Sequence, residues 1–357
     1  MTSAAPRTVL ITGANAGLGK EVARQLALRP DTAKIYLACR NENKAAAAQA
    51  GLETATGRTI FEIVVMDMTD LATVRSAVVA LDAPIDAVIM NAGGNGGATP
   101  MELTGDGVTH MFASNMLGHV VLLEQLINER KLNDVALLVG SEAARGIPKF
   151  RMQRPSFPTS SVEEFAAVID GTTFGTSKPK VALAYGQTKY VGALWMAALA
   201  RKHPDLRFIT MSPGNTPGTD AASGMPLPQR ILVQQVMTRI GPRLGIAHSL
   251  ETGAHRLVDG IANPTLRSGV FYASAANALT GPVVNQAEIF PDLANPTFQN
   301  NADEAIHRFI PERTTGPAAC TTKLVEDRQA DYSTESGCPA QADPAAERLR
   351  RVASRHL

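Results

Sequence analysis

The chain has little that would cross-link it or place it in a membrane. Its 357 residues include only three cysteines, Cys39, Cys320 and Cys338, which excludes a disulfide framework. No apolar run approaches the roughly 20 residues of a membrane-spanning helix. Met1–Arg7 is too short and polar for a signal peptide. These absences lead us to expect a cytoplasmic protein with no membrane span, whose cysteines are structural or free thiols.

The chain also has no excess of positive or negative charge. The 34 basic residues are balanced by 33 acidic ones, so no strong field would attract nucleic acid or an acidic membrane surface. Hydrophobic residues make up 45% of the chain, which is enough to bury a large core. We therefore expect a globular protein that acts on a small molecule rather than on nucleic acid, and we predict no metal site.

Short apolar runs alternate with segments of helical periodicity along most of the chain. Such βαβ alternation predicts a parallel sheet with right-handed crossovers and helices on both faces. The expected fold is α/β, a Rossmann-type doubly wound parallel sheet that forms a single domain over residues 1–311, with its ligand crevice at the carboxyl ends of the strands. The runs that predict strands are Thr8–Ile11, Lys34–Cys39, Thr59–Val65, Ala87–Met90, Val135–Val139, Arg207–Met211 and Val270–Ala273.

A glycine-rich turn directly follows the first of these runs. A strand that bends sharply into a helix, with its backbone against a pyrophosphate, needs residues without a Cβ at the turn and at the point of contact. Gly13, Gly17 and Gly19 occupy such places. The helix that begins near Leu18 would then offer free N–H groups and a positive dipole end to the phosphates. The turn predicts a dinucleotide site; the alternative is an ordinary glycine loop.

A tyrosine and a lysine four residues apart predict proton chemistry. Four positions along a helix bring Tyr185 and Lys189 to one face, where the ammonium would favour the phenolate and lower the pKa of the phenol. A phenol of ordinary pKa near 10 would otherwise be a poor acid or base at neutral pH. The alternative is a tyrosine and a lysine on a helix surface.

Several motifs, in a fixed order, resemble those of the short-chain dehydrogenase/reductase family in its classical type. The first turn matches the family's T-G-x-x-x-G-x-G, and Tyr185 with Lys189 matches its Y-x-x-x-K. The resemblance extends over roughly residues 7–290, which makes it far more specific than any one motif. The other matching segments are Asn91-Ala92-Gly93, Asn115 within S-N-M-L-G-H, Ser141 after Val135–Val139, and Pro213-Gly214 after Arg207–Met211.

The resemblance implies catalytic roles for four residues. Ser141 would hydrogen-bond the substrate oxygen near the Tyr185 hydroxyl, and Lys189 would also hold the nicotinamide ribose. Asn115 would interrupt a helix and position a water on the proton path from the lysine. The alternative for Asn115 is a polar residue solvated at a bend, and His119 is expected to pack or cap rather than to catalyse.

The end of the second expected strand bears on the choice of cofactor. Enzymes that prefer the unphosphorylated dinucleotide commonly place an acid there, whereas this chain has Arg40 and Asn41, and a guanidinium suits a 2′-phosphate. We predict NADP, with NAD less favoured, although Ala16 is not the basic residue that many NADP-preferring relatives carry. Asp67 and Met68 resemble the family's adenine-contacting position; the alternative is that Asp67 caps the helix that follows.

The segment after Pro213-Gly214 is expected to lie over the nicotinamide. Either Thr216 or Thr219 could hold the carboxamide, because the family's usual threonine position is Gly218 here. Residues 215–235 predict a mobile substrate lid. The full set of expected cofactor-binding residues is Gly13, Asn15, Ala16, Gly17, Leu18, Gly19, Arg40, Asn41, Asp67, Met68, Asn91, Ala92, Gly93, Tyr185, Lys189, Pro213, Gly214, Thr216 and Thr219.

Two regions exceed a minimal domain of this family. Residues 145–183 form a proline-containing insert, for which we expect a long loop with one short helix near Val162–Ile169. This insert, and the sequence A-C-R-N after the second strand, resemble the retinol dehydrogenase-like and protochlorophyllide reductase-like members. Residues 312–357 have little periodic apolar content and predict a flexible C-terminal tail with a short helix at its end.

Together these features predict an NADP(H)-dependent oxidoreductase that transfers hydride between nicotinamide and a carbonyl or alcohol group of a mostly apolar small molecule. Two alternatives remain, a non-catalytic nucleotide-responsive interaction protein and a light-driven protochlorophyllide-type reductase. Against the second, Asn215 stands where those reductases carry a cysteine. A homo-oligomer could form through Ala182–Lys202, in which Gly186, Gly192 and Ala193 would permit close helix packing.

Overall fold

The computed structural model describes residues 6–150, 152–175, 177, 179–216 and 247–310. The chain divides into two units, residues 1–311 and 312–357, and all described residues belong to the first. Thr219, residues 217–235 of the expected lid, and the expected tail with Cys320 and Cys338 lie outside the described residues. The predictions made for them stay predictions.

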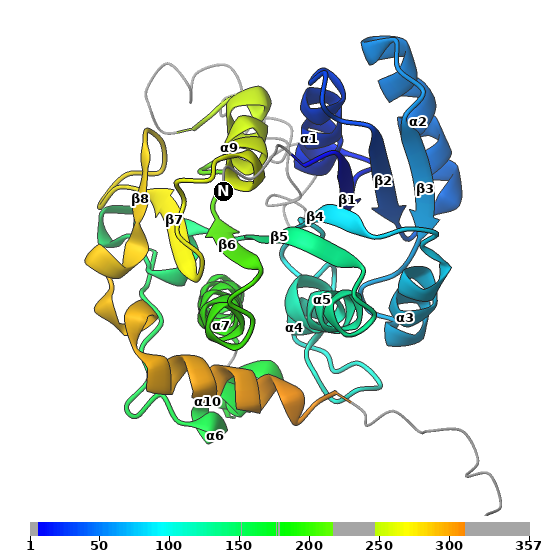
Figure 1. The fold of residues 1–357 in the computed structure, drawn as a ribbon. Coiled ribbons are helices and arrows are strands. Elements are labelled where there is room, and N and C mark those ends of the chain that lie inside the picture. Colours follow the sequence, from blue (N-terminus) through cyan, green and yellow to red (C-terminus); the bar gives the residue numbers. More distant parts are fainter. Residues whose placement is uncertain (1–5, 151, 176, 178, 217–246, 311–357) are drawn as a thin grey trace, which may run out of the picture. The chain divides into compact units, whose positions relative to one another are not determined.

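The centre of the molecule is an eight-stranded sheet with the strand order β3-β2-β1-β4-β5-β6-β7-β8 (Figure 1). All neighbouring pairs are parallel except β7 and β8, which are antiparallel. This topology confirms the doubly wound α/β fold. The expected third strand, Thr59–Val65, begins two residues before β3 and ends at the same residue, and β8 was not expected. The strands are β1 Thr8–Thr12, β2 Lys34–Cys39, β3 Phe61–Val65, β4 Ile85–Met90, β5 Leu132–Val139, β6 Arg207–Met211, β7 Val270–Ser274 and β8 Val283–Asn285.

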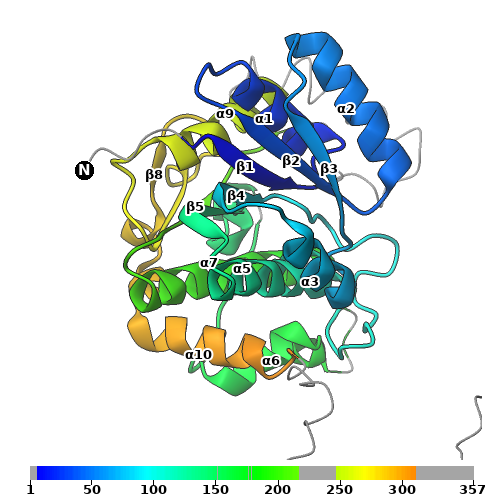
Figure 2. The same ribbon diagram turned by 45° about the vertical axis from the view of Figure 1, so that its right-hand side comes forward.

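Helices cover both faces of the sheet and enclose two hydrophobic cores (Figures 1 and 2). One face carries α1, α2 and α9, and the other carries α3, α5 and α7, with α6 and α10 outside α7. The helices are α1 Gly17–Ala27, α2 Glu42–Thr56, α3 Leu71–Ala80, α4 His110–Phe112, α5 Gly118–Asn128, α6 Val162–Ile169, α7 Val181–Lys202, α9 Leu250–Ala262 and α10 Pro296–His307. Within the described residues, none of them combines the length and apolar character needed to cross a membrane.

The insert and the last described helix cover α7. The short helix expected near Val162–Ile169 is present as α6, and both α6 and α10 pack on α7 (Figure 2). Every residue of α7 from Gly186 to Leu199 is buried. A Cβ on Gly186 would lie 2.7 Å from the Ala143 carbonyl oxygen, so this glycine faces the interior. The expectation that α7 offers its small residues to a second copy is therefore wrong for this helix, because its own chain occupies that surface.

The strand order reverses direction between β1 and β4. From β1 the chain proceeds outward through β2 and β3, then returns to place β4 on the other side of β1 and continues outward through β5, β6 and β7. The connections after β1 and β4 therefore diverge, and the carboxyl ends of these two strands are the place where ligands bind in sheets of this type. The glycine turn follows β1, and Asn91 follows β4, so both motifs lie at this edge of the sheet.

Candidate active site

The turn after β1 has the geometry that a diphosphate requires. Gly13 and Gly17 have φ angles of +66° and +52°, which favour glycine. Gly19 lies so close to the turn that an added Cβ would be 2.5 Å from the Gly13 carbonyl oxygen. Helix α1 begins at Gly17, and its N-cap residue Ala16 makes no side-chain hydrogen bond to the first turn. The N–H groups of that turn are therefore available to an anion, which fits a dinucleotide.

The Thr12 hydroxyl joins the ends of β1 and β4. Its oxygen accepts hydrogen bonds from the backbone N–H groups of Asn91, at 2.9 Å, and Ala92, at 2.8 Å. The Asn91 amide in turn donates to the Thr12 carbonyl at 2.9 Å. Because a hydroxyl oxygen has two lone pairs and one proton, that proton must point to the remaining neighbour, His119 Nε2, at 2.9 Å.

The bonds of His119 fix its tautomer. Since Nε2 accepts from Thr12, the proton of the neutral ring is on Nδ1, which donates to the Asn115 carbonyl at 3.0 Å. Burial lowers the pKa of His119 to about 4, and the nearby Lys189 contributes in the same direction. These contacts are consistent with the expectation that this histidine packs or caps. They join Thr12, at the end of β1, to the segment that carries Asn115.

We expect His119 to remain neutral, with its proton on Nδ1, down to about pH 4. Its ordinary pKa of 6.5 applies in the unfolded chain, so the folding free energy that it contributes is present above pH 6.5 and is lost as pH falls toward 4. Nitrogen-15 NMR of the imidazoles measures the tautomer and the pKa of His119. The His119 signal is assigned by its loss in a His119→Gln variant. His307 serves as the internal control, because its hydrogen bond to Glu124 raises its pKa to about 9. A His119 midpoint near the ordinary value would contradict the assignment.

Asn115 lies in a π-helical turn, Ala113–Leu117, between α4 and α5. Its side-chain amide donates to the carbonyls of Gly94, at 2.8 Å, and Met111, at 2.9 Å, and its side-chain oxygen accepts from the Gly94 N–H at 3.1 Å. The side chain is fully buried, so the alternative of a solvated residue at a bend is wrong. The expected interruption of the helix is present, and Asn115 anchors the loop that follows Asn91-Ala92-Gly93.

Ser141, Tyr185 and Lys189 come together beyond the end of β5. The Ser141 hydroxyl lies near enough to the Tyr185 phenol to lower its pKa, and Ser141 Oγ accepts from the Ala143 N–H at 3.2 Å. Lys189 Nζ donates to the Val139 carbonyl at 2.9 Å and lies 5.6 Å from the centroid of the Tyr185 ring. The serine and tyrosine hydroxyls can thus contact a single oxygen atom of a substrate.

The pKa of the phenol moves in the direction opposite to our expectation. Burial raises the pKa of Tyr185 to about 12, against the effect of the Ser141 hydroxyl, and the Glu142 carboxylate raises it further. Burial also lowers the pKa of Lys189 to about 8, so the amine is a weaker source of positive charge than we assumed. In the protein alone the neutral phenol is therefore favoured, because the effect of burial on the pKa exceeds that of the Ser141 hydroxyl.

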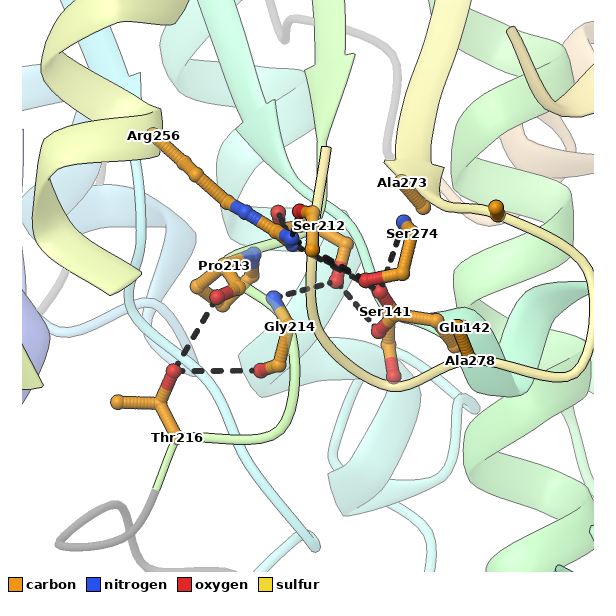
Figure 3. A network of polar contacts seen from close by, with 12 residues as sticks. Ser141, Glu142, Ser212, Pro213, Gly214, Thr216, Arg256, Ala273, Ser274 and Ala278 are labelled. Carbon is orange, nitrogen blue, oxygen red and sulfur yellow. Dashed lines mark hydrogen bonds and ion pairs between the residues drawn. The ribbon is translucent and has the colours of Figure 1, made fainter. Parts of the chain in front are cut away.

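The loop after β6 forms another wall of the site (Figure 3). Gly214 has a φ angle of +75°, and the Asn215 backbone is held by Leu279 on one side and His248 on the other. The Thr216 hydroxyl donates to the carbonyls of Pro213, at 3.2 Å, and Gly214, at 3.3 Å. Those bonds stabilise the turn itself, and the choice between Thr216 and Thr219 stays open.

The remaining expected cofactor residues lie beyond β2 and β3. Arg40 is exposed, whereas Asn41 caps α2 by accepting from the Lys44 N–H at 2.9 Å. The Asp67 carboxylate accepts from the Thr69 N–H and hydroxyl, at 2.9 and 2.8 Å, and α3 is capped by Asp70 instead. The alternative that Asp67 caps this helix is wrong.

Two further groups of residues lie beside the site, and no sequence motif indicates their place there. Cys39 is buried near the glycine turn, where the backbone N–H groups of Ala14 and Asn15 partly offset the rise that burial causes in the pKa of its thiol. Buried polar side chains lie behind Ser141 and the Gly214 loop, and no sequence motif marks them (Figure 3). They are Glu142, Arg145, Ser212, Arg256, Ser274 and Gln286.

Comparison with known proteins agrees with this geometry. The sequence model described as short chain dehydrogenase matches residues 7–145. Over this part the chain is similar to the short-chain dehydrogenase/reductase family, and it resembles the family's retinol dehydrogenase-like members.

Two relatives show the extent of the similarity. Retinol dehydrogenase 12 of Bos taurus is 33% identical over 149 residues, which are 41% of this chain and 46% of the relative. Dehydrogenase/reductase SDR family member 12 of Bos taurus is 28% identical over 217 residues, which are 59% and 62% of the two chains. The chain thus spans less than two thirds of the length of these relatives.

Solved structures with the same fold include two reductases. L-sorbose reductase from Gluconobacter frateurii, solved in complex with NADPH and L-sorbose, has a TM-score of 0.55 at 16% identity and covers 78% of this chain and 98% of its own. Salutaridine reductase from Papaver somniferum has a TM-score of 0.54 at 18% identity and covers 75% and 100%. Likeness at this level of identity establishes the fold.

Proposed function

We propose that the protein is an NADP(H)-dependent oxidoreductase that reduces a carbonyl group, or oxidises the corresponding alcohol, of a mostly apolar small molecule. One observation carries the proposal: Ser141, Tyr185 and Lys189 converge at the same edge of the sheet as a glycine turn whose first helical N–H groups are uncapped. A proton donor and a diphosphate site bordering one crevice are the two parts that nicotinamide chemistry requires.

The roles of the side chains follow from their contacts. A bound nicotinamide would supply or accept the hydride. Tyr185 would then donate its phenolic proton to the substrate oxygen, which the Ser141 hydroxyl holds beside it. Lys189 is fixed by the Val139 carbonyl in a position from which it can contact a ribose and return a proton toward the phenol.

The protonation states favour the reductive direction. Reduction requires the neutral phenol, and a Tyr185 pKa of about 12 keeps the phenol protonated throughout the neutral range. Oxidation would require the phenolate, which burial and the Glu142 carboxylate disfavour. We therefore propose carbonyl reduction as the reaction that the protein performs most readily near neutral pH.

Turnover of reduced cofactor tests the proposal. The purified full-length protein is incubated with NADPH and a panel of apolar aldehydes and ketones, and the loss of the absorbance of the reduced nicotinamide is followed. We expect carbonyl-dependent consumption of NADPH. If no carbonyl of the panel causes consumption of NADPH or NADH, the proposal of an oxidoreductase is contradicted. That result would favour the alternative of a non-catalytic nucleotide-responsive interaction protein.

Replacing Arg40 by aspartate is expected to lower the preference for NADPH over NADH by about ten- to a hundredfold, since a charge-assisted hydrogen bond to phosphate is lost and an opposing charge is added. The Arg40 guanidinium is exposed at the end of β2, where it can meet a 2′-phosphate. The ratio of kcat/KM for the two cofactors measures the change. Arg267→Asp is the matched control, because Arg267 is also exposed but precedes β7, five strands away from β2 in the sheet. An unchanged ratio in Arg40→Asp would remove Arg40 from the cofactor site.

A further inference from the structure

A buried carboxylate lies directly behind the proposed catalytic serine. Glu142, the residue after Ser141, is only 3% exposed. Its Oε2 accepts a hydrogen bond of 2.6 Å from the Ser212 hydroxyl, and its Oε1 accepts one of 3.1 Å from the Ser274 N–H (Figure 3). Ser141, Ser212 and Ser274 stand at the carboxyl ends of β5, β6 and β7, so one side chain joins the ends of three neighbouring strands.

Hydrogen bonds connect Glu142, through Ser212, to the Pro213-Gly214 loop, which is expected to lie beside the nicotinamide. The Ser212 hydroxyl donates its only proton to Glu142, and its oxygen accepts from the Gly214 N–H at 3.0 Å. Gly214 has little room to move, because an added Cβ would lie 2.5 Å from the His248 ring and 2.8 Å from the Arg256 guanidinium. The position of Pro213-Gly214 therefore depends on the hydrogen bond that Glu142 accepts.

The charge of Glu142 is balanced within the same cluster. Arg256 NH1 lies 4.0 Å from Glu142 Oε1, and both side chains are less than 10% exposed. The same guanidinium nitrogen donates to the Ser274 hydroxyl at 3.2 Å and to the Ser212 carbonyl at 3.4 Å. Desolvating two ions costs free energy that an apolar pair would not lose. A buried ion pair at this position is therefore better explained by the alignment it imposes than by stability.

We infer that Glu142 is a positioning residue of the active site, whose carboxylate sets the Pro213-Gly214 loop in register with Ser141. The inference rests on the proposed function. The contacts of the Glu142 carboxylate are with Ser212, Ser274 and Arg256. Glu142 acts through Ser212 on the loop and through the backbone on the neighbouring serine, so that the walls of the crevice on either side of the reacting groups move as one unit.

Two substitutions and one matched control test this inference. Ser212→Ala removes the link between Glu142 and the loop. Glu142→Gln keeps the shape of the side chain, but one of its two polar atoms becomes a donor, so it cannot accept from both Ser212 and Ser274. Ser268→Ala is the control, because the Ser268 hydroxyl accepts from the Phe208 N–H at 3.0 Å near the opposite end of β6. The dissociation constant of NADPH, kcat, both KM values and the thermal unfolding midpoint are measured for each protein.

We expect Ser212→Ala and Glu142→Gln to raise both the dissociation constant and the KM of NADPH about tenfold, as the loss of a hydrogen bond to a charged group predicts. The KM of the carbonyl substrate should stay unchanged. Ser268→Ala should alter the unfolding midpoint alone. A merely structural role of Glu142 would lower the unfolding midpoint in the same way without separating the two KM values.

The outcomes separate the inference from the proposed function. If the wild type binds NADPH and reduces carbonyls, and the folded Ser212→Ala protein retains wild-type affinity for NADPH, the inference is overturned. If the wild type neither binds nor consumes NADPH, the proposed function fails first and the inference fails with it. Should Glu142→Gln fail to fold, Ser212→Ala decides, because it removes only one oxygen atom.

Discussion

Replacing Tyr185 by phenylalanine is expected to lower kcat for carbonyl reduction by a hundredfold to ten-thousandfold, roughly the contribution of a positioned general acid. The substitution removes the hydroxyl that lies near Ser141 and leaves the ring, so the packing of α7 is retained. The affinity for NADPH should stay within the wild-type range, since the diphosphate turn after β1 is untouched. Steady-state kinetics together with a fluorescence titration of NADPH measure both quantities.

A second tyrosine on the same helix provides the control. Tyr190 lies on the same helix, fully buried among Phe157, Phe165 and Phe290, and within the described part of the chain its hydroxyl has no hydrogen-bond partner. Tyr190→Phe should therefore leave kcat unchanged and cost no stability. Equal kcat values for Tyr185→Phe and the wild type would mean that another group donates the proton.

The second large effect is expected from Gly19→Ala, which should weaken NADPH binding about a hundredfold or more, as overpacking against backbone forces the turn to move. The new Cβ would lie 2.5 Å from the Gly13 carbonyl oxygen and 2.7 Å from the Asn91 side-chain nitrogen. Both neighbours belong to the crevice between β1 and β4, so relief of the clash must displace the proposed diphosphate site.

Gly51→Ala is the matched control for that substitution. Gly51 lies within α2, where an added Cβ meets only the flexible end of Lys20, at 3.1 Å. Alanine in a helix interior is favoured over glycine by about 0.5–1 kcal/mol, so this variant should be as stable as the wild type or slightly more stable. Isothermal titration with NADPH compares the two variants. Wild-type affinity in Gly19→Ala would exclude the glycine turn from cofactor binding.

The sheet and the residues at its edge could be predicted from the sequence because each depends on a local requirement. A buried parallel strand needs a short apolar run, and a strand that turns at once into a helix needs glycine at positions such as Gly13. Tyr185 and Lys189 share a helix face through their spacing alone. These signals lie within a few residues of one another, so no knowledge of distant contacts is necessary to interpret them.

The features that could not be predicted depend on contacts between distant segments. Glu142 meets Ser212 and Ser274 across 70 and 132 positions of sequence, and nothing in the local pattern marks it. The covering of α7 by α6 and α10 also arises only in the folded chain. The direction of the Tyr185 pKa shift was missed for a related reason: spacing places Lys189 near the phenol, but it says nothing of how completely both groups are desolvated.

The central claim is that one crevice brings a nicotinamide and the Tyr185 phenol to the same carbonyl group. Reaction of a carbonyl substrate with NADPH that carries deuterium at both hydrogen positions of the para carbon of the nicotinamide ring tests this most directly, with mass spectrometry of the product and of the spent cofactor. The account predicts an alcohol that carries one deuterium on the former carbonyl carbon, formed by the wild type and almost lost in Tyr185→Phe. An alcohol without deuterium, or label transfer that is equally fast in Tyr185→Phe, would contradict it.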